Sequence, residues 1–157
     1  MKKIGIILAL ISLTIGVFGQ YKGKITKIYD GNTFWAELSN GITDSIKFYG
    51  IDCPELDQQY GVAAKEHLES QLNRDIELEY KGRDRNNYMM AIVTYTTKNG
   101  DKVNMNEELL ENGYAWKNKY TDNKKFEKLE KEARKKKAGL WRNEDAVPPW
   151  EYRKQKH

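Results

Sequence analysis

The rest of this chain is organised around one stretch, Ser45-Ile46-Lys47-Phe48-Tyr49-Gly50-Ile51-Asp52-Cys53-Pro54-Glu55. It begins as an alternating strand and ends in a turn that Pro54 stops. The turn carries two carboxylates, Asp52 and Glu55, and the strand carries a cation, Lys47. A strand that delivers one positive charge and two carboxylates to a single loop predicts a phosphate or metal site.

The pattern on either side of this stretch predicts a small α+β protein. Strands are expected over residues 21–28, 33–39, 43–51, 75–80 and 88–96. One helix is expected between the third and fourth strands, and two follow the fifth, the first capped by Asn104 and the second by Asp122 or Asn123. This order suits a five-stranded OB-fold β-barrel with three helices. Pro148-Pro149-Trp150 is expected to end all helix, leaving a basic C-terminal tail over residues 151–157.

Residues 1–19 are expected to be a signal peptide. Met1-Lys2-Lys3 is a short basic segment, and residues 4–18 are almost wholly apolar. A membrane anchor is the alternative, but about 15 apolar residues fall short of the ~20 that a spanning helix needs. We therefore expect a domain over residues 20–150 that is secreted or periplasmic, with no membrane association after cleavage. Its only cysteine is Cys53, which excludes an internal disulfide.

Short motifs along the chain match those of a known family. They are Tyr29-Asp30-Gly31-Asn32-Thr33, residues 47–55, Asp84-Arg85, Val103-Asn104, Gly113-Tyr114-Ala115-Trp116 and Ala138-Gly139-Leu140-Trp141. On these motifs the chain resembles the staphylococcal nuclease (thermonuclease-like) family from about residue 21 to residue 150. The resemblance implies a calcium-dependent phosphodiesterase that acts on DNA and RNA. In that family two aspartates and a backbone carbonyl bind the metal, a glutamate activates water, and two arginines bind the phosphate.

The resemblance assigns a role to individual positions of this chain. It places Asn32, Asp52 and the carbonyl of Cys53 at the metal, Glu55 at the general base, and Lys47 and Tyr88 at the two arginine positions. Arg83, Arg85 and Tyr120 are expected to contact the substrate. One of the two loop arginines can swing inward to replace the arginine missing at position 88, and the alternative is that both are solvated loop charges.

Three of these positions depart from the family pattern. Asn32 removes a formal negative charge from the metal site, which lowers the expected calcium affinity. Lys47 lacks the planar fork with which arginine grips a phosphate, and Tyr88 brings no positive charge. Removing one preorganised transition-state donor typically costs about 10²–10³ in rate.

We therefore expect a monomer with a weakened or lost Ca²⁺ site, which binds nucleic acid weakly and cleaves it weakly or not at all. Two alternatives stay open: an active metal-dependent endonuclease with a modified site, and a non-catalytic interaction module. The formal net charge of +4 does not decide among them. The run Arg134-Lys135-Lys136-Lys137 is typical of a solvated helix end, although it can also attract phosphate.

Overall fold

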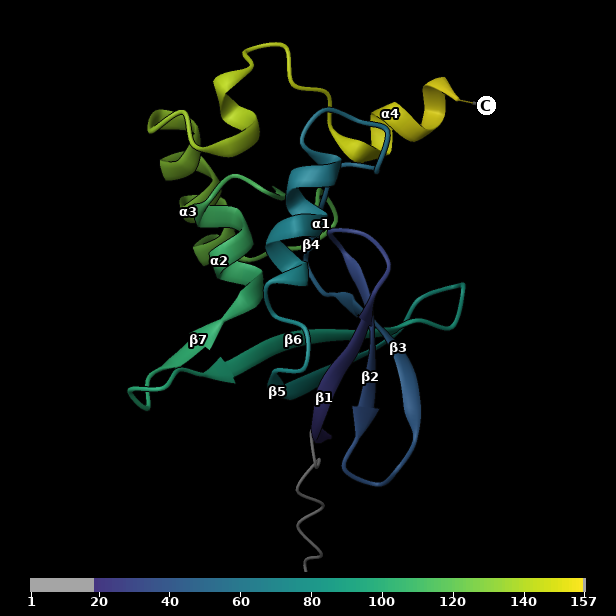
Figure 1. Ribbon diagram of the computed structural model, residues 1–157. Coiled ribbons are helices and arrows are strands. Elements are labelled where there is room, and N and C mark those ends of the chain that lie inside the picture. Colours follow the sequence, from purple (N-terminus) through teal and green to yellow (C-terminus); the bar gives the residue numbers. More distant parts are fainter. Residues whose placement is uncertain (1–18, 157) are drawn as a thin grey trace, which may run out of the picture.

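A β-barrel and a group of helices over one of its ends make up the computed structural model, which describes residues 19–156 (Figure 1). The expected signal peptide therefore lies, apart from Gly19, outside the described residues. Among residues 19–156, no helix has the length and apolar character that crossing a bilayer requires.

The five expected barrel strands are present. They are β1 (Gln20–Ile28), β2 (Thr33–Leu38), β3 (Thr43–Phe48), β5 (Asp75–Arg83) and β6 (Met89–Thr96). They pair in the order β3-β2-β1-β5-β6, and a parallel pairing of β3 with β6 closes the barrel. The prediction of a five-stranded OB-fold barrel is confirmed. The third strand was expected to reach residue 51, but β3 ends at Phe48, and Ile51 begins a separate short strand, β4 (Ile51–Asp52), which pairs with β8 (Trp116–Lys117). The short strand β7 (Lys102–Asn104), which was not predicted, extends the sheet at β6.

Alternation along the strands explains the barrel core. Phe34 and Phe48 point inward from β2 and β3, with ring centroids 5.4 Å apart, and both are fully buried. Residues that alternate with the inward-facing ones along each strand, such as Trp35 and Lys47, lie on the outer surface of the barrel. The outer face of β3 therefore carries Lys47 toward the end of the barrel where the carboxylates lie.

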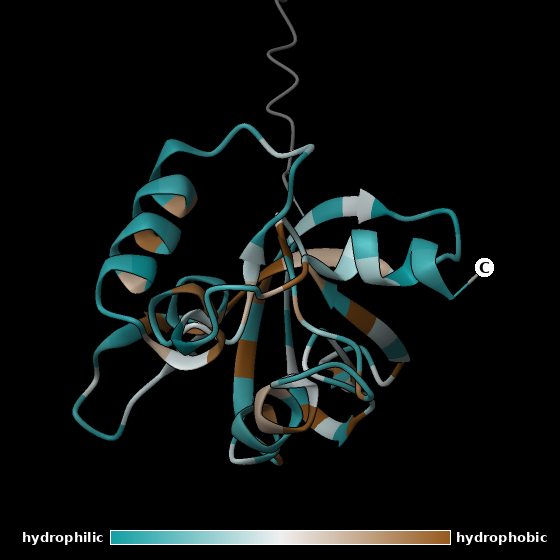
Figure 2. Ribbon diagram, turned by 90° about the horizontal axis from the view of Figure 1, so that it is seen from above, coloured by the Kyte–Doolittle hydropathy of each residue, from teal (hydrophilic) through white to brown (hydrophobic). Residues whose placement is uncertain are grey.

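The three expected helices are α1 (Gly61–Glu69), α2 (Met105–Glu111) and α3 (Lys124–Lys135). The side-chain oxygen of Asn104 accepts the backbone N–H of Glu107 at 3.2 Å, and Asn123 caps α3 in the same way through Phe126 at 3.1 Å. The buried line of α3 faces the protein interior while its lysines face outward (Figure 2).

The helix count was too low. A 3₁₀ turn, η1 (Gly139–Arg142), and a helix, α4 (Pro149–Gln155), follow α3. The prediction that Pro148-Pro149-Trp150 ends all helix is wrong, because Pro149 stands at the first position of α4. A proline fits there, since the first N–H of a helix has no intrahelical partner and the fixed φ suits the helix. Most of the expected tail is therefore the helix α4.

Candidate active site

The turn between β1 and β2 is locked against the segment that carries the carboxylates. The carboxylate of Asp30 accepts the backbone N–H of Asn32 at 2.8 Å, which holds the turn closed. A Cβ atom on Gly31 would lie 2.6 Å from the Cβ atom of Ala64 on α1, so only glycine allows this approach. The Sγ atom of Cys53 donates to the carbonyl of Gly31 at 3.0 Å. Asn32 and the Cys53 backbone therefore come from adjacent loops.

The side chain of Cys53 is turned into the protein, which leaves only its backbone for the role expected from the resemblance. Its side chain is buried, and burial, with the charges of Asp52 and Asp30, raises the pKa of its thiol well above the usual value. The thiol is therefore protonated and serves as a donor to Gly31. This leaves the carbonyl as the metal-binding group expected at this position.

Asp52 is a buried carboxylate at the top of the barrel. It lies on β4 opposite Trp116 of β8 and is 6 % exposed. Burial raises its pKa above the ordinary value, whereas the hydrogen bond and charge of Arg153 and the charge of Lys47 lower it. Two cations from distant parts of the chain therefore act on the same carboxylate.

Glu55 is presented by a tight turn at the start of α1. Its backbone N–H donates to the side-chain oxygen of Gln58 at 3.2 Å, and its carbonyl accepts the backbone N–H of Gln58 at 2.9 Å. A Cβ atom on Gly61 would lie 1.8 Å from the Glu55 carbonyl, so this turn requires glycine at position 61. The turn fixes the backbone of the expected general base.

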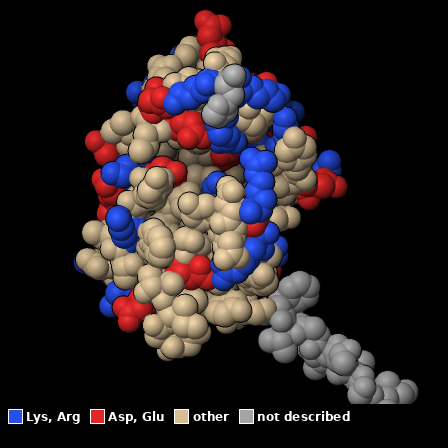
Figure 3. Space-filling model, turned by 90° about the vertical axis from the view of Figure 1, so that its right-hand side faces the viewer, with Lys and Arg blue, Asp and Glu red and all other residues tan. Residues whose placement is uncertain are grey.

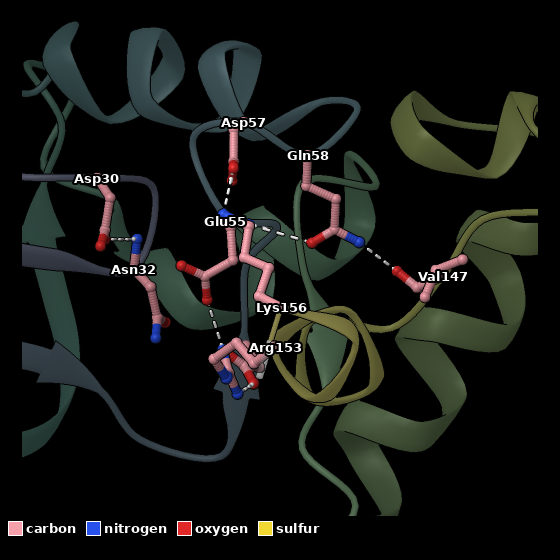
Figure 4. Close-up of polar contacts among 9 residues, drawn as sticks. Asp30, Asn32, Glu55, Asp57, Gln58, Val147, Arg153 and Lys156 are labelled. Carbon is pink, nitrogen blue, oxygen red and sulfur yellow. Dashed lines mark hydrogen bonds and ion pairs between the residues drawn. The ribbon is translucent and has the colours of Figure 1, made fainter.

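Arg153 of α4 joins the two carboxylates, a contact that the sequence did not reveal (Figure 4). Its Nη2 atom lies 2.6 Å from Oδ2 of Asp52, and its Nη1 atom lies 2.6 Å from Oε1 of Glu55. Nη1 also contacts Oδ1 of Asp52 at 3.4 Å. These contacts raise the pKa of the Arg153 guanidinium, against the burial that lowers it. The guanidinium thus bridges the expected metal ligand and the expected base.

Packing of α4 explains why Arg153 reaches this position. Trp150 packs edge to face on Trp116, with ring centroids 6.0 Å apart, and Trp116 is the strand partner of Asp52. Residues three apart on a helix share a face, so anchoring Trp150 beside Asp52 aims Arg153 at the carboxylates. The spacing of Trp150 and Arg153 indicates that they share a helix face, but it does not indicate which residues that face meets.

Polar contacts hold α4 against the loop that carries Glu55. The side-chain amide of Gln58 donates to the carbonyl of Val147, just before α4. The Tyr152 hydroxyl donates to the carbonyl of Asp57 at 3.2 Å, and the Lys156 ammonium pairs with the Asp57 carboxylate. These contacts do not involve Arg153, so the helix is fixed independently of it.

The two positions that the resemblance assigns to arginines lie together. Parallel pairing places Lys47 of β3 opposite Met90 of β6, two residues after Tyr88. The Nζ atom of Lys47 lies 5.5 Å from the centre of the Tyr88 ring, within cation–π range. The backbone N–H of Tyr88 donates to Asp84 at 3.0 Å. Lys47 supplies the only positive charge of this pair.

Arg83, Arg85 and Tyr120 are placed away from the carboxylates. Arg83 is held by an ion pair with Asp44 at 2.5 Å and by the carbonyl of Asn87 at 2.6 Å. Arg85 is exposed on the loop, and Tyr120 is 85 % exposed. Within residues 19–156, none of the three contacts Asp52 or Glu55. Their expected role in substrate binding stays a prediction.

The oxygen atoms at this end of the barrel fit a hard cation in part. Oδ1 of Asn32 is buried with no hydrogen-bond partner, and an unpaired buried oxygen of this kind fits the role of a cation ligand. Figure 4 shows the Asn32 side chain pointing into the same region as Glu55 and Arg153. In the described part of the chain, no cluster of three or more His, Cys, Asp or Glu could hold a metal. A cation would therefore use Asn32, Asp52 and the Cys53 carbonyl, with the single full charge of Asp52.

Comparisons with known proteins match most of the chain. Residues 45–143 match the model of a family described as "Staphylococcal nuclease homologue". The chain is 28 % identical to a micrococcal nuclease of Shigella flexneri over 90 % of this chain and 86 % of that protein. It is 32 % identical to an uncharacterized endonuclease of Escherichia coli O157:H7, over 85 % of this chain and 86 % of that protein. An uncharacterized endonuclease of Haemophilus influenzae is 28 % identical over 84 % of this chain and 72 % of that protein.

Proposed function

Because this chain belongs to the staphylococcal nuclease homologue family, we propose that it binds DNA or RNA and hydrolyses their phosphodiester bonds slowly, through a weakened metal site. The family supports action on nucleic acid. The weakening rests on this chain's own residues. The observation that carries it is the bridge from Arg153 to Asp52 and Glu55, at 2.6 Å from each carboxylate.

The bridge slows the reaction through both carboxylates. A cation that binds Asp52 must compete with a guanidinium that already holds this carboxylate through two hydrogen bonds. Glu55 accepts a charge-assisted hydrogen bond from the same group, so one of the oxygens that could take up the proton of the water is already occupied. Asn32 adds an oxygen without a charge, so the metal gains little from it.

Each side chain has a defined task in the proposed reaction. Glu55 accepts the proton of the attacking water, and Lys47 attracts the phosphate by charge. When bound, Ca²⁺ would polarise a phosphoryl oxygen. Compared with the family pattern, position 47 lacks the two-pronged donor of an arginine and position 88 lacks a positive charge. Both differences remove donors that stabilise the transition state.

Metal-dependent cleavage of single-stranded DNA tests this proposal. Purified protein is incubated with the DNA in calcium, in manganese and in chelator, beside Glu55→Gln and Glu66→Gln. Glu66 is a matched control, since it is exposed on α1. We expect slow cleavage in metal that Glu55→Gln abolishes and Glu66→Gln retains. If the unaltered chain neither binds nor cleaves the DNA, the proposal is overturned in favour of a non-catalytic interaction module.

An endonuclease of ordinary rate with a modified site is the second candidate. Its support is that the bridge, although it occupies both carboxylates, also places a guanidinium beside them, where it can stabilise transition-state charge in place of the arginine missing at position 88. Single-turnover rates decide between the two. A chain in which Asn32→Asp, Lys47→Arg and Tyr88→Arg are combined should cleave faster than the unaltered chain if the site is weakened. If this variant folds and cleaves no faster, the site is not weakened at these positions.

Export and a monomeric state are part of the proposal. The basic and apolar pattern of residues 1–19 supports removal of a signal peptide and release to the periplasm or medium. N-terminal sequencing of the protein recovered from cell fractions and medium tests this, with a mature chain starting near Gln20 as the expected result. Sedimentation analysis of the same material tests whether it is a monomer.

A further inference from the structure

We propose that Arg153 of α4 is the second phosphate-binding cation of this site and binds the phosphodiester on which Glu55 acts. This inference rests on the proposed function, because it assigns a residue of the same site to the nucleic-acid phosphate. It gives the C-terminal helix a role in recognising substrate.

The guanidinium has unused donors. A guanidinium has five N–H donors. Arg153 makes three hydrogen bonds to the carboxylates, two to Asp52 and one to Glu55. The side chain is 45 % exposed, and none of its three hydrogen bonds uses Nε–H. A phosphate can therefore approach the free edge of a guanidinium whose orientation the carboxylates already fix.

Arg153 is the guanidinium at the right place. Within the described part of the chain, it is the arginine that contacts both Asp52 and Glu55. Arg83 is occupied by Asp44 and by a carbonyl oxygen. Lys47 brings a point charge without the planar fork. Arg153 thus supplies the two-pronged donor that phosphate recognition favours.

A purely structural role explains Arg153 less well. The helix is already fixed by Trp150 on Trp116, by the Tyr152 hydroxyl on Asp57, and by the Val147 carbonyl on Gln58. Figure 3 shows Lys and Arg side chains gathered on the face that carries the C-terminal end, where they attract a polyanion. An ion pair that served only to hold the helix would not need a half-exposed guanidinium between two carboxylates.

The placement links the base to the phosphate. A guanidinium that holds Glu55 through Nη1 and a phosphate through its free edge keeps the general base beside the group that is attacked. Because the contact to Asp52 uses both terminal nitrogens, a metal at Asp52 would release donors of Arg153 toward the phosphate.

Binding of a fluorescent single-stranded DNA in chelator, by anisotropy, is the first test. Arg153→Gln should weaken binding about tenfold or more, the scale of one charge-assisted hydrogen bond together with the repulsion of two uncovered carboxylates. Lys154→Gln is the matched control, because Lys154 pairs with Glu151 on the same helix, and it should change binding by about twofold or less. Arg153→Lys should fall between, since it keeps the charge without the fork. Circular dichroism confirms that each variant is folded.

The NMR signal of the Arg153 Nε–H on addition of inorganic phosphate is the second test. We expect it to shift with saturation in the unaltered chain and in Lys154→Gln. If the Nε–H signal shifts with phosphate but the unaltered chain binds no DNA, Arg153 is a phosphate site and only the nucleic-acid function is overturned. DNA binding that is equal in Arg153→Gln and Lys154→Gln, with no phosphate-dependent shift, would overturn the proposal and leave the nucleic-acid function standing.

Discussion

Asn32 is the residue at which the proposed metal site is weakest. Its side-chain oxygen is buried without a partner, and it brings no charge. Replacing it by aspartate adds a full negative charge to the proposed ligand set, in which Asp52 supplies the other. We expect Asn32→Asp to raise the affinity for Ca²⁺ by about tenfold, which is ~1.4 kcal/mol. Calorimetric titration with Ca²⁺ measures it.

The same substitution should destabilise the metal-free protein. The new carboxylate is buried and, unlike that of Asp52, has no cation partner, which lowers the free energy of unfolding by about 1–3 kcal/mol. Asn40→Asp is the matched control, because Asn40 is exposed in the β2–β3 turn and accepts the N–H of Ile42 as aspartate also can. Thermal melts with and without Ca²⁺ should separate the two variants. Equal calcium affinity in both would mean that position 32 is not a ligand.

The pKa of Asp52 reports the bridge to Arg153. Burial raises this pKa above its ordinary value of 3.8, and Arg153 opposes the rise. The folded protein therefore retains a proton that the unfolded chain has lost, and stability falls as pH rises from the ordinary to the folded pKa. Arg153→Gln should raise the pKa further and widen this window. Carboxyl ¹³C NMR titration measures the shift, and an unchanged pKa in Arg153→Gln would contradict the bridge. Lys154→Gln should leave it unchanged.

At the scale of elements, α4 shows where sequence patterns stop being informative. The barrel strands were predictable because inward and outward residues alternate over six to nine positions. Asp52 and Glu55 were predictable because one local turn carries both. Helix α4 has seven residues, as α2 has, but it lacks a capping side chain such as Asn104 of α2, and it forms where Trp150 meets Trp116. Its contact to Asp52 spans 101 residues, and no local pattern records such a contact.

Docking of α4 should depend on Trp150. Trp150→Ala removes the packing on Trp116, and we expect a loss of about 1–3 kcal/mol in the free energy of unfolding, since the ring is half-buried. The same change should weaken single-stranded DNA binding, because Arg153 loses its fixed position. Tyr152→Phe is the control, removing one hydroxyl contact to the Asp57 carbonyl at a cost of about 0.5–1.5 kcal/mol. Chemical denaturation and anisotropy measure both variants.

At the scale of the whole molecule, the excess of positive charge is small and its placement matters. The formal net charge is +4. Helix α3 carries many lysines, but ion pairs such as Lys128 with Glu132 and Arg134 with Glu130 offset their charge along the helix. Arg134 also lies over the ring of Trp141 at 3.6 Å, which fixes it in the fold. Much of the positive charge of α3 is therefore offset locally, and the cations beside the carboxylates are the ones that the proposed site would use.

Salt dependence should locate the nucleic-acid surface. For single strands, the slope of log affinity against log salt changes by about 0.7 for each phosphate contact. We expect Lys47→Ala and Arg153→Gln each to make the slope shallower by roughly that amount. Lys131→Gln should leave the slope unchanged, because Lys131 lies exposed on α3, a helix that carries none of the residues of the proposed site. Anisotropy at a series of salt concentrations measures all four proteins. A slope that responds to Lys131→Gln and not to Arg153→Gln would move the binding surface to α3, and the C-terminal helix would then serve only to cover the end of the barrel.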